Sequence, residues 1–310
     1  MAHQGVGFRS ERGPVLIAGM LATGLVSLEG TIVATAVPSI VDDLGGFTAY
    51  PWLFSAFLLA QAVLTPIYSK LADIVGRKPV LLFGIAVFIL GSVLCALAPS
   101  MVWLIVFRVV QGVGAGAILP LVMTITGDLY TIQERPRVQG YIGSVWAASS
   151  VLGPVLGGLF AQTIGWAWIF WINLPLGALA GWLLLRAFRE QVQRRSHRID
   201  VAGAALLTVA LTLLLLGILE GGVAWEWTSP MSIGLFAGAV AVFVAFVLVE
   251  RRAAEPVLSL GVITRRVVLV TSLTAAGVGV IVLGVTSFAP TYLQTAAGAD
   301  PLVAGLAVGA

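Results

Sequence analysis

Long apolar runs alternate with short polar segments along the whole chain. Nine runs are each close to the roughly 20 residues that a helix needs to cross a bilayer. They occupy residues 14–38, 51–68, 79–98, 102–126, 140–162, 168–185, 201–219, 231–249 and 267–289, and a tenth begins near Leu302. This pattern predicts an all-α polytopic membrane protein.

The first apolar run has an alternative interpretation as a secretory signal peptide. Its Ala34, Thr35 and Ala36 look like a cleavage site. The run is too long for a signal core, however, and Glu29 interrupts it. We therefore expect the run to remain as the first membrane-spanning helix.

Composition strengthens the membrane assignment and narrows the chemistry. Hydrophobic residues make up 59% of the 310 residues and charged residues only 10%, whereas a soluble domain carries about 25% charged residues. Cys95 is the only cysteine, so no internal disulfide forms. No zinc-ligand spacing, phosphate-binding loop or catalytic triad is present. We expect no enzyme activity, cofactor, metal or nucleic-acid partner.

The charge distribution predicts the orientation. With the N-terminus in the cytoplasm, alternate segments place 16 of the 17 Lys and Arg residues on the cytoplasmic side, all except Arg108. The outer loops instead carry Asp42, Asp43, Glu226 and Asp300. This asymmetry fits the positive-inside rule, and it predicts a multi-pass protein with a cytoplasmic N-terminus.

A short charged segment, SKLADIVGRK, separates the second and third runs. Gly76 suits a turn in which a side chain would collide. Asp73 and Arg77 are four residues apart, so a helical turn would bring them together. The segment is either a positively charged loop that only sets orientation or a conformational latch.

One face of the fourth run carries polar and small residues. Arg108, Gln111, Gly112, Ala115 and Gly116 recur at a spacing of three to four residues, so they share one helical face. A buried guanidinium is costly and is expected to face a wet cavity or a carboxylate. Snorkelling to the interface is the alternative, and a depth of roughly 9 Å makes it only partly available.

The fifth run contains two stripes of small residues in SSVLGPVLGG. Ser149, Gly153 and Gly157 form one stripe, and Pro154 and Gly158 belong to the next. Small residues at this spacing let helix backbones approach closely, and Pro154 removes one backbone donor. Ordinary helix packing also accounts for such stripes.

Three of these segments resemble signatures of the major facilitator superfamily. The charged segment is similar to Gly-x-Leu-Ala-Asp-x-x-Gly-Arg-Lys, with Ser69 at the first glycine. The face that begins at Arg108 resembles the Arg-x-x-Gln-Gly signature of helix four. The stripes around Pro154 resemble the Gly-Pro-x-x-Gly-Gly signature of antiporters on helix five.

Two further segments resemble the fourteen-helix drug:proton antiporter branch of that family. LEGTIVATAVP in the first run is similar to the helix-one signature of the branch, with Glu29 in place of aspartate. WAWIFWINLPLG in the sixth run is also similar, with Ala167 where the branch usually has arginine.

The resemblance implies a domain plan and roles for single residues. It divides the chain into five parts: a cytoplasmic tail (1–13), a six-helix bundle (14–185), a cytoplasmic linker (186–200), a pair of linker helices (201–249), and a loop with the start of a second bundle (250–310). It implies a proton-coupling and substrate cavity, a cytoplasmic gate and an antiporter packing motif. The residues are Glu29, Arg108 and Gln111 for the cavity, Asp73, Gly76, Arg77, Lys78 and Asp128 for the gate, and Gly153, Pro154, Gly157 and Gly158 for the packing motif.

These roles together imply proton-coupled efflux of lipophilic or cationic small molecules by alternating access, in a monomer in the plasma membrane. Two alternatives stay open: a transporter for one metabolite or lipid, and a non-transporting sensor or scaffold. A static Glu29–Arg108 ion pair that only fixes packing is also open. The sequence stops inside an apolar run at Ala310, so we expect these residues alone not to transport.

Overall fold

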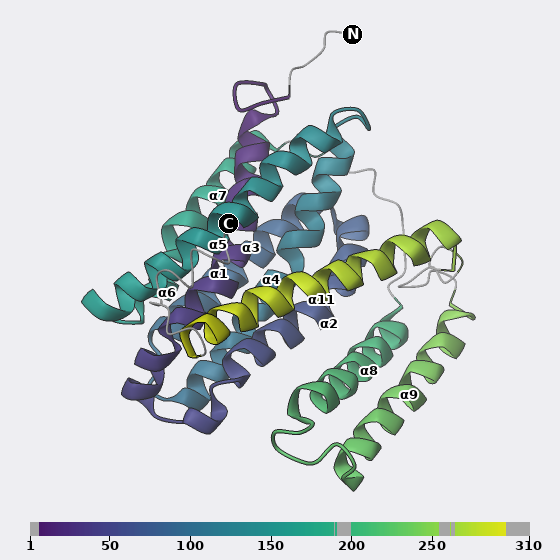
Figure 1. The fold of residues 1–310 in the computed structure, drawn as a ribbon. Coiled ribbons are helices and arrows are strands. Elements are labelled where there is room, and N and C mark those ends of the chain that lie inside the picture. The colour runs from purple at the N-terminus through teal and green to yellow at the C-terminus, as the bar shows by residue number, and fades with distance from the viewer. Residues whose placement is uncertain (1–5, 189, 191–199, 254–260, 262–263, 296–310) are drawn as a thin grey trace.

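The chain is helical throughout in a computed structural model that describes residues 6–188, 190, 200–253, 261 and 264–295 (Figure 1). A short 3₁₀ turn, η1, follows the first helix. The helices are α1 (Gly13–Leu44), α2 (Trp52–Val75), α3 (Arg77–Ala96), α4 (Met101–Leu129), α5 (Arg135–Thr163), α6 (Trp168–Trp171), α7 (Asn173–Ala187), α8 (Val201–Glu220), α9 (Pro230–Glu250) and α11 (Arg266–Thr295). The predicted all-α fold is confirmed.

Seven helical segments of the described residues are long and apolar enough to cross a membrane, with α6 and α7 together forming one of them. The apolar stretches within α8 and α11 are shorter, at Ala202–Ile218 and Arg266–Ile281. The tenth predicted run, near Leu302, lies outside the described residues. The protein is therefore an integral multi-pass membrane protein.

Two helix boundaries differ from the predicted ones. α1 continues through Pro38 to Leu44 instead of ending at residue 38, because Ile40 extends its fully buried face. The predicted charged loop between the second and third runs shrinks to one residue, since only Gly76 separates α2 from α3. Its φ of 113° is a conformation that side chains other than glycine disfavour, so the chain turns there within a single residue.

The sixth predicted run is divided into α6 and α7 at Ile172. Pro175 explains the division, because proline has no backbone N–H to donate to the carbonyl of Trp171 four residues earlier. Asn173 consequently begins a new helix in the middle of the bundle. The polar side chain of Asn173 thus lies beside a backbone position that lacks a regular helical hydrogen bond.

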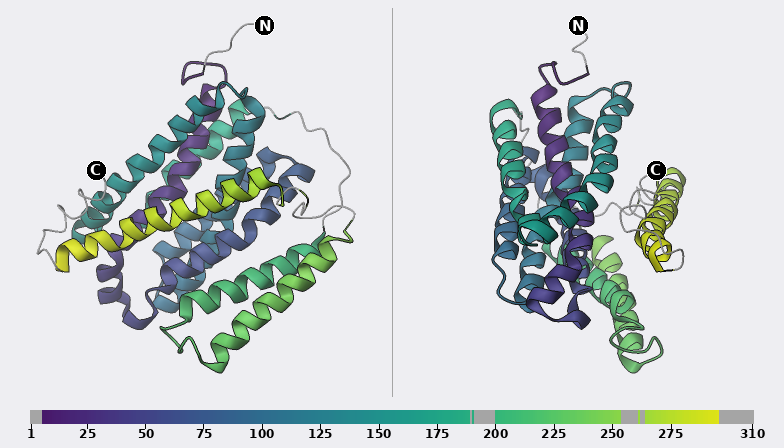
Figure 2. Two further views of the ribbon diagram at one scale, coloured as in Figure 1. Left: turned by 45° about the vertical axis from the view of Figure 1, so that its right-hand side comes forward. Right: turned by 60° about the vertical axis from the view of Figure 1, so that its left-hand side comes forward.

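α1 to α7 form one bundle, in which α4 packs on both α2 and α3 while α1 packs on α5 and α7 (Figure 2). α8 and α9 form an antiparallel hairpin that contacts α2 through α8, and α11 lies apart from the bundle in the right-hand view of Figure 2. We call the end of the bundle with Arg12, Gly76, Arg77, Lys78 and Arg135 the basic end.

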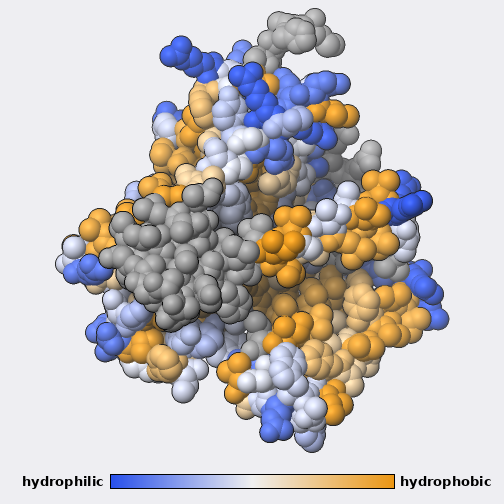
Figure 3. All heavy atoms as spheres, viewed as in Figure 1, coloured by the Kyte–Doolittle hydropathy of each residue, from blue (hydrophilic) through white to orange (hydrophobic). Residues whose placement is uncertain are grey.

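Apolar side chains are spread over the sides of the molecule, as a membrane protein requires. Figure 3 shows hydrophobic surface over α9 and α11, with hydrophilic surface gathered at the basic end near the N-terminus. α5 illustrates this arrangement, because large side chains such as Trp146, Leu152 and Leu159 are about half exposed. Inside the bundle the buried apolar residues fall into two separate clusters.

Candidate functional site

A buried ion pair joins α1 to α4. Arg108 donates through Nη1 to Oε1 of Glu29, and the two side chains are 1% and 0% exposed. Neither charge reaches the bundle surface, so the snorkelling alternative for Arg108 does not apply. An intramembrane charge is expensive unless it is paired in this way.

The guanidinium of Arg108 also contacts α2 and its own helix. Nε donates to the carbonyl of Leu53 at 2.8 Å, and Nη1 donates to Oε1 of Gln111 at 2.6 Å. The ring of Phe57 lies 4.3 Å from the guanidinium carbon, in the position of a cation–π contact. Arg108 therefore holds three helices together through one charged group.

α3 and α7 complete the cluster with two neutral side chains. Gln111 donates through Nε2 to Oγ of Ser92 on α3 at 2.8 Å. Asn173 on α7 donates through Nδ2 to Oε2 of Glu29 at 2.8 Å and to Oγ of Ser92 at 3.2 Å. These side chains come from four helices, and α2 joins them through the Leu53 carbonyl. We call the network of side chains the polar layer: Glu29, Ser92, Arg108, Gln111 and Asn173.

The polar layer separates the two apolar clusters of the bundle. On α1 the cluster toward the basic end includes Val26 and the other begins at Ile32, with Glu29 between them. On α4 the same boundary falls between Leu104 and Ala115. Apart from contacts to the Leu53 carbonyl and the Cys95 thiol, these polar groups are satisfied by one another, so the network specifies how the five helices are aligned.

Close helix contacts seal the polar layer. A Cβ added to Gly91 on α3 would lie 2.7 Å from Cβ of Gln111, and one added to Gly112 on α4 would lie 2.9 Å from Cβ of Ala60. The absence of side chains at these positions lets α3 and α2 pack directly against α4. Glu29, Arg108 and Gln111 are consequently buried inside the bundle, at 0%, 1% and 0% exposure.

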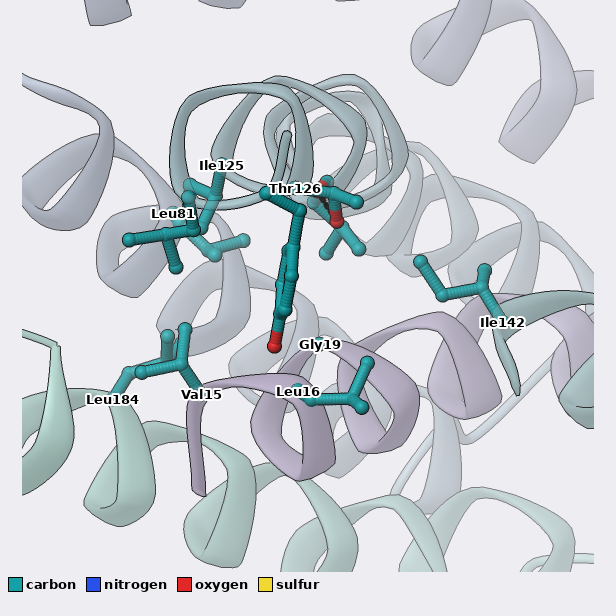
Figure 4. Close-up of a pocket in the computed structure, with 11 residues that line it drawn as sticks. Val15, Leu16, Gly19, Leu81, Ile125, Thr126, Ile142 and Leu184 are labelled. Carbon is teal, nitrogen blue, oxygen red and sulfur yellow. Dashed lines mark hydrogen bonds between the residues drawn. The ribbon is translucent and has the colours of Figure 1, made fainter. Parts of the chain in front are cut away.

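Two cavities of the described residues lie elsewhere. One, near the basic end, holds about 10 Å³ and has Val15, Leu16, Leu81, Ile125 and Leu184 around it (Figure 4). The other holds about 380 Å³ between α2 and α8 and is lined mainly by leucines and alanine. Neither is bordered by a member of the polar layer.

Arg77 is the centre of a second group of charges, at the basic end. Its guanidinium lies 3.6 Å from Asp73, one helical turn earlier, and 2.9 Å from Asp128 on α4. The Asp73 and Asp128 side chains are 58% and 51% exposed. Exposed pairs of this kind contribute about 0.2–1 kcal/mol each, so the two ion pairs alone are weak.

Lys78 and Glu190 strengthen this corner by reciprocal capping. The Glu190 carboxylate accepts from the backbone N–H groups of Arg77 and Lys78 at 2.7 and 2.9 Å, which are the first two donors of α3. Lys78 in turn donates through Nζ to the carbonyls of Leu185 and Phe188 at 3.0 and 2.5 Å, where α7 ends. Each helix end thus receives the charge that its dipole favours.

The N-terminal segment forms a third contact at the basic end. Arg12 donates to both carboxylate oxygens of Glu134 at 3.2 and 3.1 Å and to the carbonyl of Leu129 at 2.6 Å. Glu134 also accepts from the backbone N–H of Thr131, and this bond, followed by the one from Arg12, lowers the pKa of the carboxyl below its ordinary value. The start of α1 is thereby tied to the connection between α4 and α5.

The glycine stripe of α5 packs against threonines of α1. A Cβ added to Gly153 would collide with Thr31, and one added to Gly157 would collide with Thr35. Thr31 donates to the carbonyl of Ser149 at 3.0 Å, which fixes the register between the helices. Two other residues of the predicted motif do not share this contact, because a Cβ at Gly158 would meet nothing within 4 Å and Pro154 is only half-buried.

Sequence reasoning missed three polar residues of these sites: Ser92, Asn173 and Glu190. Asn173 gave the clearest available signal, since it is a lone amide in an apolar run, two residues before a proline. Ser92 follows Gly91, which is a weaker signal. Glu190 lies among many other charges and carries no pattern of its own.

The comparisons with known proteins agree with this architecture. Residues 19–310 match the sequence profile of the Major Facilitator Superfamily. The chain is 38% identical over 291 residues to Multidrug resistance protein 3 of Bacillus subtilis, covering 94% of this chain and 57% of that protein. It is also 38% identical over 298 residues to Efflux pump dotC of Dothistroma septosporum, covering 94% of this chain and 51% of the relative. The chain thus spans about half the length of these relatives.

Solved structures show the same fold at low sequence identity. The D-xylose-proton symporter superposes with a TM-score of 0.54 at 13% identity, covering 96% of this chain and 78% of that one. The human organic anion transporter MFSD10 gives a TM-score of 0.54 at 20% identity, covering 66% of this chain and 55% of the other. The solved structures share the fold of this chain, and the sequence match over residues 19–310 shows that it belongs to the Major Facilitator Superfamily of membrane transporters.

Proposed function

We propose that the protein exports lipophilic or cationic small molecules in exchange for protons, by alternating access between two bundles. One observation carries the proposal: Glu29 and Arg108 form a buried ion pair inside the bundle, within a network whose side chains come from α1, α3, α4 and α7. Relatives described as a multidrug resistance protein and as an efflux pump support the substrate class.

Protonation of Glu29 is the step that connects proton movement to a change in shape. The carboxylate accepts a proton and becomes neutral, so its attraction to the Arg108 guanidinium weakens. Because this pair joins α1 to α4, its weakening loosens the contact between those helices. A buried pair responds strongly to such a change, since a lost partner inside a bundle costs about 3–5 kcal/mol.

The sealed position of the pair constrains this mechanism. Glu29 is fully buried, so a proton reaches it only when the bundle opens locally. The static alternative predicts that such opening has no effect on transport. In the proposed mechanism the opening belongs to the transport cycle, and Gln111 supports Arg108 while Glu29 is neutral, through the 2.6 Å contact.

We propose that the basic end faces the cytoplasm and that the protein lies in the plasma membrane. We also propose a gate at this end, formed by Asp73, Gly76, Arg77, Lys78 and Asp128. The two ion pairs of Arg77 are exposed and weak. The backbone caps supplied by Lys78 and Glu190 add charge-assisted hydrogen bonds, worth about 1.5–3 kcal/mol each when shielded. The whole corner, rather than one pair, is therefore the element that biases the access state.

The glycine stripe of α5 has a mechanical role in this proposal. Gly153 and Gly157 keep α5 close against Thr31 and Thr35 of α1. Since α1 also carries Glu29, movement that begins at the polar layer passes directly to the α1–α5 contact. Pro154 and Gly158 lie beside the contact and leave α5 a face without close packing.

The test is transport by the complete gene product in inside-out vesicles with an acidic lumen. We expect accumulation of lipophilic cations, lost in Glu29→Gln and retained in Glu29→Asp at matched protein levels. Selective uptake of one metabolite or neutral lipid from a mixed panel would identify a narrow transporter. Uptake by Glu29→Gln with an unchanged response to the pH gradient would place the proton site elsewhere.

A further inference from the structure

Asn173 lies within WAWIFWINLPLG, the sixth-run segment that resembles the antiporter branch, and no role has yet been given to its amide. It is 1% exposed and is the first residue of α7. Its side-chain nitrogen lies between two acceptors, Oε2 of Glu29 at 2.8 Å and Oγ of Ser92 at 3.2 Å. One amide group therefore connects the carboxylate of α1 to the hydroxyl of α3.

The two oxygens of Glu29 have different partners. Oε1 accepts from the positively charged Arg108, whereas Oε2 accepts from the neutral amide of Asn173. The bond from Arg108 joins two opposite charges, whereas the bond from Asn173 joins a charge to a neutral amide, so the Arg108 bond is the stronger of the two. A proton that arrives at the carboxylate displaces the weaker donor, so Oε2 is the oxygen that receives it.

The backbone beside Asn173 is suited to moving this donor. Pro175 leaves the carbonyl of Trp171 without its helical partner, and the helix is divided at Ile172. A shift in the first turn of α7 moves the Asn173 amide without breaking a complete helix. The Ser92 hydroxyl holds the amide beside Glu29, because it accepts from Asn173 at 3.2 Å and is itself fixed by accepting from Gln111 at 2.8 Å.

We propose that Asn173 is a positioning residue for proton coupling: its amide occupies Oε2 of Glu29 until movement at the α6–α7 division withdraws it and lets a proton bind there. This inference rests on the proposed function, because it assigns a control on the same carboxylate. An amide that donates to a carboxylate favours the ionised form. Asn173 thereby sets the proton concentration at which the exchange cycle responds.

Few other ionisable groups face this carboxylate in the described part of the chain. α4 contributes Arg108, and α3 contributes the Cys95 thiol, 3.9 Å from Gln111. The charged residues of α2, α5 and α7 lie toward the basic end, at Lys70, Asp73, Arg135, Arg137 and Arg186. A change at Asn173 therefore acts on Glu29 with little interference from further charges.

The experiment measures substrate exchange by the complete gene product in proteoliposomes as a function of pH, equal on both sides. We expect Asn173→Ala to move the midpoint of the pH profile by about one unit toward alkaline pH. Asn173→Leu keeps a similar side-chain volume and removes the donor without adding a charge, so it moves the midpoint in the same direction and also serves if the alanine variant folds poorly. Ser92→Ala, which frees the amide without touching Glu29, gives a smaller shift of the same sign.

Two controls separate this inference from the proposed function. Thr65→Val removes a different interhelical bond, from Thr65 to the carbonyl of Gly116 at 3.3 Å, and leaves the midpoint unchanged. Glu29→Gln flattens the profile if the proposed function holds. A flat Glu29→Gln profile with unshifted Asn173 and Ser92 variants would overturn the role of Asn173 alone. An intact profile in Glu29→Gln would overturn the proposed function itself.

Discussion

The buried pair gives a quantitative prediction about stability. Arg108→Leu removes the charge that pairs with Glu29 and leaves a carboxylate that is 0% exposed with only a neutral donor, Asn173. Removing one partner of a buried pair costs about 3–5 kcal/mol. Arg108→Leu with Glu29→Leu removes both charges, and replacement of a buried pair by apolar side chains is often close to neutral.

The double variant does not recover completely, because two interhelical bonds are also lost, from Arg108 to the Leu53 carbonyl and from Asn173 to Glu29. Interhelical hydrogen bonds in membrane proteins average about 0.6 kcal/mol, so loss of these two leaves a penalty of about 1 kcal/mol. We therefore expect the single variant to be about 2–4 kcal/mol less stable than the double variant. The sign of this difference is the distinctive feature, since an additional substitution restores stability.

The assay is reversible unfolding of the detergent-solubilised protein by sodium dodecyl sulfate, monitored by circular dichroism. It compares the wild type with Arg108→Leu, with the double variant and with a control. Thr65→Val is the matched control for an ordinary interhelical bond, with an expected loss of about 0.6 kcal/mol. Equal stability of the single and double variants would show that Glu29 does not depend on Arg108. Our account of the polar layer would then be refuted.

Three other predictions concern the ends and sides of the bundle. Glu190→Ala removes both caps from the first turn of α3, so the amides of Arg77 and Lys78 should exchange hydrogen about tenfold faster, and unchanged exchange would refute the reciprocal capping. The pKa of Glu134 in the folded protein lies below its ordinary 4.5, so the Arg12–Glu134 contact should persist above pH 4.5 and be lost as the pH falls through the lowered value. Hydrogen exchange at residues 6–12, measured as a function of pH, checks this. Glu134→Gln should remove the pH dependence. Gly157→Ala should destabilise the α1–α5 contact by about 1–3 kcal/mol because its Cβ meets Thr35, while Gly158→Ala meets nothing within 4 Å and should be neutral in the same unfolding assay.

Much of the helical framework was predictable from the sequence because the length and the apolar composition of a segment are enough to identify a membrane-spanning helix. The i to i+4 spacing of Asp73 and Arg77 also placed these two side chains together in advance. The boundary at residue 38 was wrong, since a proline inside an apolar run does not reveal whether the buried face continues beyond it. Ile40 continues it here.

The enclosure of the polar layer was not predictable from residue types. Glu29 and Arg108 both lie within apolar runs, but whether water reaches them depends on how closely the helices pack. Gly91 and Gly112 determine that distance, and a glycine in an apolar run looks the same whether or not another helix lies against it. Asn173 and Ser92 escaped notice because single neutral polar residues are common in such runs.

The role of Glu29 is tested most directly by the proton that it is proposed to carry. Proteoliposomes containing the complete gene product and an internal pH indicator are mixed with a lipophilic cation in the absence of any imposed gradient. We predict that addition of the cation moves protons in the opposite direction, and that Glu29→Gln abolishes this movement while still binding the cation. Cation-driven proton movement of normal size in Glu29→Gln would contradict the account.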